Sequence, residues 1–210
     1  VIGDVRQIEP IYSIPRSVDI GNLIHHGGLP ESFIEGDLKW LEGLGKTSSS
    51  GNVMTIAQSV SRYHYDEDVP RGMFLYAHRR CYNEIVSFCN ALCYKNKLIP
   101  MRGPRKNDPD ALPAMGYFDI AGHCKTKSSG TRYNFPEANA IALWINDNKE
   151  TLEAKYNKPI NEIIGIVTPF SGQVDTIRSA LRKVGIDTTS ESGMTIGTVH
   201  SLQGAERDIV

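Results

Sequence analysis

The chain has 210 residues, of which 40% are hydrophobic, so it is long enough to bury a substantial core as one large domain or one and a half. Its formal net charge of −1 gives no overall basic character, and any binding of nucleic acid must therefore depend on local clusters of charge. No run of about eighteen apolar residues is present, and the N-terminus lacks the charged-then-apolar order of a signal peptide. We therefore expect no membrane partner and a cytoplasmic location.

Apolar periodicity predicts strands and helices that alternate along most of the chain. The run 163–167 is continuously apolar, as expected of a strand that is covered on both faces. The helix predicted after it spaces its apolar residues three and four apart and ends before Gly185. Such alternation indicates parallel strands joined by right-handed crossovers, and therefore an α/β fold. In chain order, the predicted elements are a helix at 33–44, a strand at 73–77, a helix at 83–94, a weaker strand at 117–120, a helix at 137–156, a strand at 163–167, a helix at 171–184 and a strand at 194–198.

The segment 46–72 is predicted to be an irregular insertion, because it is rich in Ser, Gly and charged residues. Gly45-Lys46-Thr47, which overlaps its start, resembles the end of a phosphate-binding loop, but that pattern needs Gly at position 40, where this chain has Trp40. The residues before it also read as a helix, whereas a phosphate loop follows a strand. We therefore predict that the chain contains no phosphate loop.

The cysteines are predicted to be reduced thiols in the core and not metal ligands. Cys89 and Cys93 fall on one side of the helix 83–94 with Phe88 and Leu92, at the spacing of a buried stripe. No C-x-x-C pair is present in the sequence. Because a buried cysteine packs as a small apolar residue, we predict no metal site.

Polar side chains follow three of the predicted strands. Arg79 and Arg80 come soon after the first strand, and Thr168 comes directly after the third, with Gln173 one turn further on. The last strand ends at Thr198, and a dense polar loop follows it. Because the carboxyl ends of parallel strands meet at one edge of a sheet, where α/β proteins bind ligands, these groups are predicted to share one ligand site.

Two loops, at 102–106 and 125–127, carry basic residues that could contact a nucleic-acid backbone. No aromatic residue is interleaved with their charges in the sequence. Single-stranded nucleic acid is usually bound by positive charge together with aromatic rings on which its bases stack. We therefore interpret both loops as solvated surface charge.

The polar loop after the last strand resembles motif V of superfamily 1 helicases, in the branch that contains the RNA-surveillance helicases. Residues 199–208, Val-His-Ser-Leu-Gln-Gly-Ala-Glu-Arg-Asp, match that motif, except that His200 stands where the family usually has Asp. Further segments resemble family motifs in the family's order. They are 3–10 (Gly-Asp-Val-Arg-Gln-Ile-Glu-Pro, motif III), 76–98 (motif IV, with Arg80 at the position of the motif arginine) and 165–173 (Gly-Ile-Val-Thr-Pro-Phe-Ser-Gly-Gln, the family's Thr-Pro segment).

The resemblance implies a RecA-like parallel sheet with helices on both faces, which we expect to be incomplete at both ends. Residues 1–10 would be a remnant of motif III from a preceding RecA-like domain, and residues 11–210 the second RecA-like helicase domain, truncated after motif V. The parent protein would be an ATP-dependent helicase, an ATP hydrolase that moves along single-stranded DNA or RNA. The upstream RecA-like domain of the same protein would be the structural partner, and the isolated chain would be inactive.

The resemblance also implies roles for individual residues. The second RecA-like domain of such helicases supplies positive charge to the transferred phosphoryl group, and arginine suits this because its planar guanidinium is permanently charged. A plain alternative for Arg80 is a surface ion pair with Glu84, and for the threonines it is helix capping or strand packing. The implied assignments are catalytic roles for Gln7 and Arg80, nucleotide contacts for Gly204 and Glu206, and nucleic-acid contacts for Thr168 and Thr198.

The implied cofactors are ATP and Mg²⁺, with the magnesium ligands expected in the upstream domain. Two other functions stay open on the sequence alone. One is a remodelling ATPase of the same fold that does not separate strands, which an unwinding assay would distinguish from a helicase. The other is a non-catalytic nucleic-acid-binding module, against which an intact phosphate loop upstream would argue.

Overall fold

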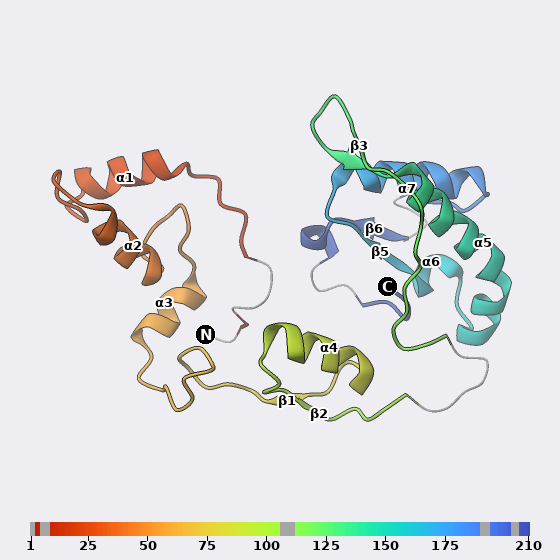
Figure 1. Cartoon of the computed structure of the whole chain (residues 1–210), viewed down its shortest axis with the longest axis horizontal. Coiled ribbons are helices and arrows are strands. Elements are labelled where there is room, and N and C mark those ends of the chain that lie inside the picture. The colour runs from red at the N-terminus through yellow and green to blue at the C-terminus, as the bar shows by residue number, and fades with distance from the viewer. Residues whose placement is uncertain (1–2, 5–8, 106–111, 190–193, 203–205) are drawn as a thin grey trace. The chain divides into compact units, whose positions relative to one another are not determined.

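The computed structural model describes residues 3–4, 9–105, 112–189, 194–202 and 206–210. The chain divides into two compact units, Val1–Gly116 (unit 1) and Tyr117–Val210 (unit 2), which are seen in Figure 1. None of the helices among the described residues combines the length and the hydrophobicity that a membrane-spanning segment needs. In unit 1 the described elements are α1 (Arg16–His25), α2 (Glu35–Gly43), α3 (Val53–Val60), β1 (Ala77–His78), α4 (Asn83–Cys93) and β2 (Ile99–Pro100).

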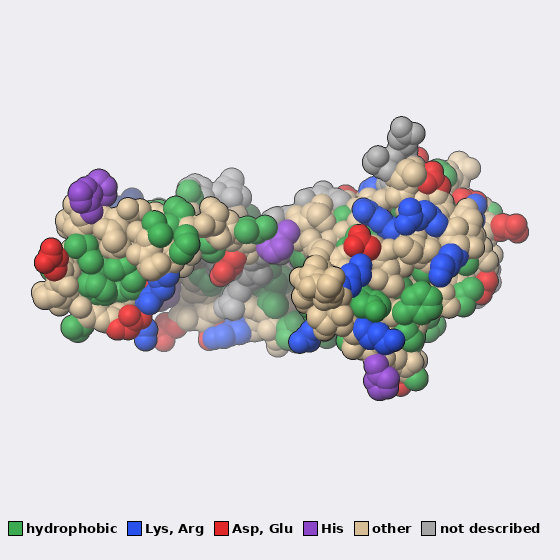
Figure 2. Space-filling model, turned by 90° about the horizontal axis from the view of Figure 1, so that it is seen from above, with side chains coloured by type: hydrophobic (Ala, Val, Ile, Leu, Met, Phe, Trp, Pro, Cys, Tyr) green, Lys and Arg blue, Asp and Glu red, His purple; other side chains and the backbone are tan. Residues whose placement is uncertain are grey.

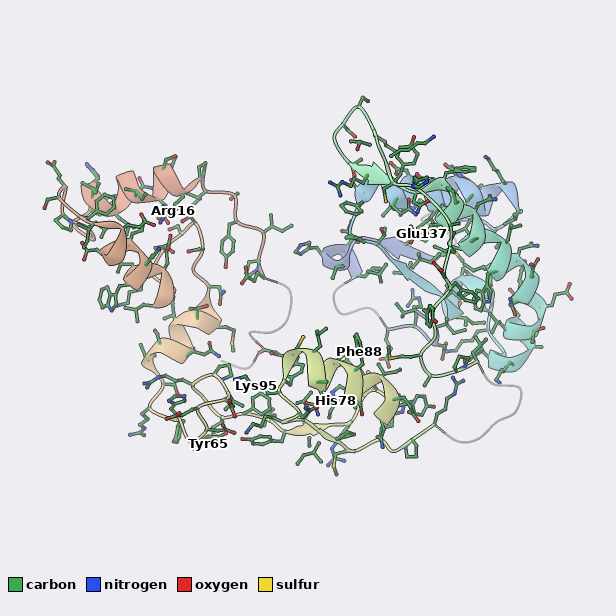
Figure 3. All side chains as sticks on the ribbon, viewed as in Figure 1. Arg16, Tyr65, His78, Phe88, Lys95 and Glu137 are labelled. Carbon is green, nitrogen blue, oxygen red and sulfur yellow. The ribbon has the colours of Figure 1, made fainter. Side chains whose placement is uncertain are left out.

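The first two helices of unit 1 pack on a small apolar core. Leu29, Leu38 and Leu41 are buried together between α1, α2 and the loop that joins them. Arg16 at the start of α1 donates to Glu35 at 2.6 Å and to Glu42 at 2.9 Å, and Figure 3 shows it facing α2. These ion pairs are partly exposed, so most of the stabilisation comes from the leucine core.

Helix α3 lies inside the segment 46–72 that was expected to be irregular. It begins after Asn52, whose side-chain oxygen accepts from the Thr55 amide at 2.9 Å, which is the standard N-terminal cap. The residues that follow, Val-Met-Thr-Ile-Ala-Gln-Ser-Val, form the helix. The overall composition of the segment concealed this short apolar stretch and its cap.

Asp19 on α1 is almost fully buried, and its carboxylate accepts from the Ser49 amide at 2.8 Å and from the Ser49 hydroxyl at 2.7 Å. Burial by itself would raise the pKa of this carboxyl, but the hydrogen bonds from the Ser48–Ser49 loop outweigh it and lower the pKa below its ordinary value of 3.8. The pKa of Asp19 is lower in the folded protein than in the unfolded chain. The ionised carboxylate therefore stabilises the fold fully at a pH above its unfolded-state pKa, and this stabilisation is lost as the pH falls through the folded-state pKa. An asparagine at this position would not titrate, so Asp19→Asn should lose less stability in acid than the wild type. Urea titrations at a series of pH values from about 5 to about 2 measure the free energy of unfolding of each protein, and the decrease with falling pH should be smaller for the variant. Equal losses in the two proteins would contradict this.

Helix α4 packs over the short parallel pair β1–β2, in which Ala77 pairs with Ile99. The buried residues of α4 are Val86 and Asn90, and not the predicted apolar stripe. Asn90 can be buried because its side-chain nitrogen donates to the Leu98 carbonyl and its side-chain oxygen accepts from the Leu98 amide, both at 2.9 Å. Phe88 and Leu92 are 56% and 72% exposed, and Cys89 is exposed as well. Figure 3 shows Phe88 on the side of α4 that faces away from β1. The prediction that Cys89 lies in a buried stripe with Phe88 and Leu92 is therefore wrong.

Unit 2 contains the longer helices and a second parallel pair of strands. Strands β5 and β6 pair in parallel with Ile166 opposite Ile196, and Ile209 forms a parallel bridge with Ile164. Helix α5 packs against α7, and α7 against β6, around fully buried residues that include Ile145 and Leu181. The described elements are β3 (Lys125–Thr126), β4 (Arg132–Tyr133), α5 (Phe135–Tyr156), α6 (Ile160–Ile163), β5 (Gly165–Val167), α7 (Ser171–Lys183), β6 (Thr195–Gly197) and the 3₁₀ helix η1 (Val199–Leu202).

The fold is α/β, as predicted, although its sheets are small. The helices and strands expected between 137 and 198 are present within a few residues of their predicted bounds. The strand expected at 117–120 is not formed, and the antiparallel hairpin β3–β4 follows it instead. The strand expected at 73–77 is reduced to Ala77–His78.

Candidate functional site

Strands β5 and β6 end side by side, and a threonine follows each of them. The Thr168 amide donates to the Gly197 carbonyl at 3.1 Å, which continues the parallel pairing by one residue beyond β5. Thr168 is buried, and its hydroxyl oxygen lies 3.5 Å from the Phe170 amide that it accepts from. Thr198 is half-buried, and its hydroxyl makes no hydrogen bond to another described residue. The structure therefore brings these two threonines to one edge, with Thr198 the freer of the two.

The turn after Thr198 is tight and leads into η1. The Thr198 carbonyl accepts from the amide of Ser201 at 3.0 Å and from its hydroxyl at 2.8 Å. A β-carbon on Gly197 would lie 2.1 Å from the Ser201 hydroxyl oxygen, so any larger residue would force the Ser201 side chain to move from this position. None of the expected site residues is Gly197, although a glycine one residue before a polar loop is the kind of signal that marks such a turn.

The end of the same polar loop lies at the other end of the strands. The Gly165 amide donates to the Ile209 carbonyl at 2.9 Å, and Arg207 donates to the Thr195 hydroxyl, so 207–209 adjoin the amino ends of β5 and β6. Asp208 pairs with Lys158 at 2.8 Å, and this hydrogen bond raises the pKa of Lys158. The expectation that the whole loop sits on one edge of the sheet therefore holds for its beginning and not for its last residues.

Gln173 is 3% exposed and joins the start of α7 to the start of α5. Its amide nitrogen donates to the Asn134 carbonyl and to the Glu137 carboxylate, both at 3.1 Å, and its oxygen accepts from the Asn134 amide at 2.7 Å. Figure 3 labels Glu137 in the first turn of α5. Because the nitrogen and the oxygen of this side chain are both engaged within the protein, through three hydrogen bonds, Gln173 fixes the loop after β5 in place and is not directed toward a ligand.

Arg80 lies in unit 1, in the turn between β1 and α4. It is exposed, and among the described residues its guanidinium makes no ion pair, including with Glu84. Its carbonyl accepts from the Arg102 guanidinium, which also lies 4.1 Å from the centroid of the Tyr82 ring. Arg102 therefore supports the turn, while the side chain of Arg80 stays free to bind an anion.

The remaining predicted site residues are placed as follows. Glu206 is exposed, and its carbonyl accepts from Arg207 at 2.7 Å. Gln7 and Gly204 lie outside the described residues. Arg80 belongs to a different unit from Thr168 and Thr198, so the shared ligand site stays a prediction for Arg80. Within the described ranges, no group of three or more His, Cys, Asp or Glu residues is arranged to hold a metal ion.

Comparisons with known proteins identify the family. A protein named "Probable helicase with zinc finger domain" is 26% identical over 144 residues in Homo sapiens and 27% identical over 144 residues in Danio rerio, in each case over 68% of this chain and 7% of that protein. The "5'-3' DNA helicase ZGRF1" of Mus musculus is 24% identical over 132 residues, which are 62% of this chain and 7% of that protein. The chain thus spans about 7% of the length of the curated relatives it matches. Residues 57–210, well over half of the chain, match the family model of the AAA domain. The chain therefore belongs to this AAA domain family, which is found in superfamily 1 helicases, and it is a helicase motor domain with a RecA-like α/β fold.

Proposed function

We propose that the chain is the second RecA-like domain of a longer ATP-dependent helicase, and that it couples ATP hydrolysis to movement along single-stranded nucleic acid. The observation that carries the proposal is the pairing of β5 with β6, which brings Thr168 and Thr198 to one edge. The carboxyl ends of parallel strands are the usual place for ligands in α/β sheets. The match to helicase-named proteins that are many times longer agrees with a domain of a larger enzyme.

In this proposal, the two threonines contact the phosphates of the strand. A hydroxyl that donates to a phosphate positions the strand without reading its sequence. Thr198 is the stronger contact, because the hydroxyl of Thr168 also accepts from the Phe170 amide. The enzyme would then hold a strand of any sequence, as translocation requires.

Arg80 acts on the nucleotide in this proposal. Its exposed guanidinium, which has no ion-pair partner among the described residues, fits a phosphate group. Gln7, Gly204 and Glu206 are proposed to complete the nucleotide contacts, with ATP and Mg²⁺ as cofactors. ATP supplies the phosphoryl group that is transferred to water, and this chain contributes the positive charge that faces it. The chain by itself is proposed to lack ATPase turnover, since the magnesium ligands are assigned to the other RecA-like domain.

Replacing both threonines by alanine in the full-length helicase tests this proposal. Loss of two hydroxyl contacts is expected to weaken single-strand binding roughly ten-fold, because each net hydrogen bond contributes about 0.5–1.5 kcal/mol. The affinity for ATP should stay within about two-fold. Fluorescence anisotropy with labelled oligonucleotides and with a fluorescent ATP analogue measures the two affinities. Thr151→Ala with Thr188→Ala is the matched control, and unchanged strand affinity in the Thr168 and Thr198 double variant would remove both from the site.

A further inference from the structure

The hairpin β3–β4 carries positive charge beside an aromatic ring. Lys125 pairs with Tyr133 across the two strands, and the Lys127 amide donates to the Thr131 carbonyl at 2.9 Å as the pairing continues. Residues two apart share a face of a strand, so Lys125, Lys127 and Tyr133 lie on one face, and Arg132, which pairs with Thr126, lies on the other. The Lys127 ammonium lies 6.0 Å from the centroid of the Tyr133 ring. The hairpin therefore combines cations with a ring, which its local sequence at 125–127 does not reveal.

The hairpin is fixed against the N-terminus of α7. The Thr131 hydroxyl accepts from the Gly172 amide at 3.0 Å and lies 3.2 Å from the Ser171 hydroxyl. A β-carbon on Gly172 would lie 2.9 Å from the Arg132 carbonyl oxygen, so the two backbones approach closely. In Figure 1 the hairpin projects from unit 2 directly beside α7. It is therefore held next to the segment that leads from Thr168 into the helix.

That segment adds a second ring to the hairpin. Phe170 is 38% exposed, and the Arg132 guanidinium carbon lies 6.0 Å from the centroid of its ring. Phe170 also donates its amide to the Thr168 hydroxyl oxygen. The cations and rings of the hairpin are thus connected to one of the two threonines at the carboxyl ends of β5 and β6.

The positive charge of the hairpin β3–β4 is only partly neutralised by ion pairs. Lys127 pairs with Asp175 at 3.1 Å, whereas Lys125 and Arg132 are exposed and make no ion pair within the described part of the chain. Figure 2, which looks onto the molecule from the side on which the hairpin projects in Figure 1, shows several patches of Lys and Arg on unit 2. Uncompensated cations next to exposed ring surface suit an anionic ligand that also has flat faces to stack.

We propose that the hairpin binds single-stranded nucleic acid through Lys125, Lys127 and Tyr133 on one face and through Arg132 beside Phe170 on the other, and we name these five residues the hairpin surface. The inference rests on the proposed function and extends its strand-binding site beyond Thr168. Lys125 and Arg132 contact backbone phosphates, and the Phe170 ring stacks on a base that is unpaired and therefore accessible. A duplex keeps its bases stacked inside, so it offers the ring no such face. This replaces the interpretation of 125–127 as solvated loop charge.

The test measures binding of the purified 210-residue chain to fluorescent oligo(dT) and oligo(U) by anisotropy over a series of salt concentrations. Lys125→Ala with Arg132→Ala is expected to weaken binding about ten-fold and to reduce the slope of log affinity against log salt by about 1.4, since each single-strand phosphate contact contributes about 0.7. Phe170→Leu keeps apolar volume but removes the ring, and it is expected to weaken binding about five-fold with an unchanged salt slope. If the substitutions weaken binding to both oligonucleotides equally, the contacts are to phosphates and base faces. If they weaken binding to oligo(U) alone, the ribose hydroxyl is contacted as well. Either result supports the hairpin surface.

Lys149→Ala with Arg182→Ala is the matched control, because it removes two charges of unit 2 that lie on α5 and at the far end of α7. The hairpin surface is excluded if Lys125→Ala with Arg132→Ala leaves affinity and slope unchanged, or if the control variant loses as much. If the hairpin variants bind normally while the Thr168 and Thr198 double variant does not, the inference fails and the proposed function stands. If the wild-type chain shows no salt-dependent binding to either oligonucleotide, the inference fails, and the Thr168 and Thr198 double variant of the full-length protein decides the proposed function separately.

Discussion

If the chain belongs to a longer ATP-dependent helicase as proposed, Arg80→Ala in that protein is expected to lower ATPase turnover by about 10³-fold or more, with only a small change in ATP affinity. Guanidinium groups that reach a transferred phosphoryl group contribute about 10³ to 10⁵ in rate in related phosphoryl-transfer enzymes. An interaction made mainly in the transition state lowers the turnover number and leaves ground-state binding nearly unchanged. Steady-state ATPase assays at saturating single strand measure the first quantity, and titration with a fluorescent ATP analogue measures the second.

Two neighbouring substitutions define the specificity of that result. Arg80→Lys should restore little turnover, because lysine keeps the charge and loses the planar fork that binds phosphate oxygens in pairs. Arg79→Ala should be milder, although Arg79 is equally exposed in the structure. If Arg79→Ala abolishes turnover while Arg80→Ala does not, the alignment of this turn with motif IV is shifted by one residue. If neither matters, the catalytic assignment of the turn fails.

Gln173→Ala is expected to lower the free energy of unfolding by about 2–3 kcal/mol. The substitution leaves the amide of Asn134 without its acceptor and removes the donor to Glu137, while the Asn134 carbonyl keeps its hydrogen bond from the Ala138 amide at 3.2 Å. Leaving a buried group unpaired costs about 1–3 kcal/mol, which exceeds the net contribution of an ordinary hydrogen bond. Urea unfolding followed by circular dichroism gives the free energy.

The Gln173 variants also separate packing from hydrogen bonding. Gln173→Glu keeps the shape and one acceptor, but it places a carboxylate beside Glu137, so it should be at least as destabilising at neutral pH and less so in acid, where protonation supplies a donor. Glu150→Ala on the exposed side of α5 is the control and should change stability by less than about 0.5 kcal/mol. A Gln173→Ala protein as stable as this control would show that the three hydrogen bonds are replaced by water at no cost.

The helices and strands of unit 2 could be predicted because their apolar residues follow simple periods. The continuous run 163–167 and the three-and-four spacing in 171–184 are local properties of the sequence, and β5 and α7 follow from them. The hairpin could not be found in this way, since Lys125–Thr126 and Arg132–Tyr133 are short and polar. They become strands through pairing with each other and through the Thr131 contacts with α7.

Where a buried position is occupied by a polar residue, the sequence pattern was misleading. Asn90 is buried in α4 because it satisfies both backbone groups of Leu98, and the apolar Phe88 is left exposed. The spacing of apolar residues cannot predict that Asn90 is buried, because its hydrogen-bond partner lies eight residues away. The candidate site shows the same limit. The pairing of β5 with β6 brings Thr168 and Thr198 together as their strand positions predict, but the support that Arg102 gives to the Arg80 turn depends on a contact across 22 residues.

The parallel bridge between Ile164 and Ile209 has a consequence for the segment that joins Thr198 to Ile209. This segment starts at the carboxyl end of β6 and finishes beside the amino end of β5, so it must run back along strands that are only about 10 Å long. The four residues of η1 rise about 2 Å each and the others can reach at most about 3.3–3.6 Å each, so the segment could span about 30 Å, roughly three times the length of the strands. The chain between these two points is therefore longer than the connection alone requires, and the additional residues include the polar ones that resemble motif V.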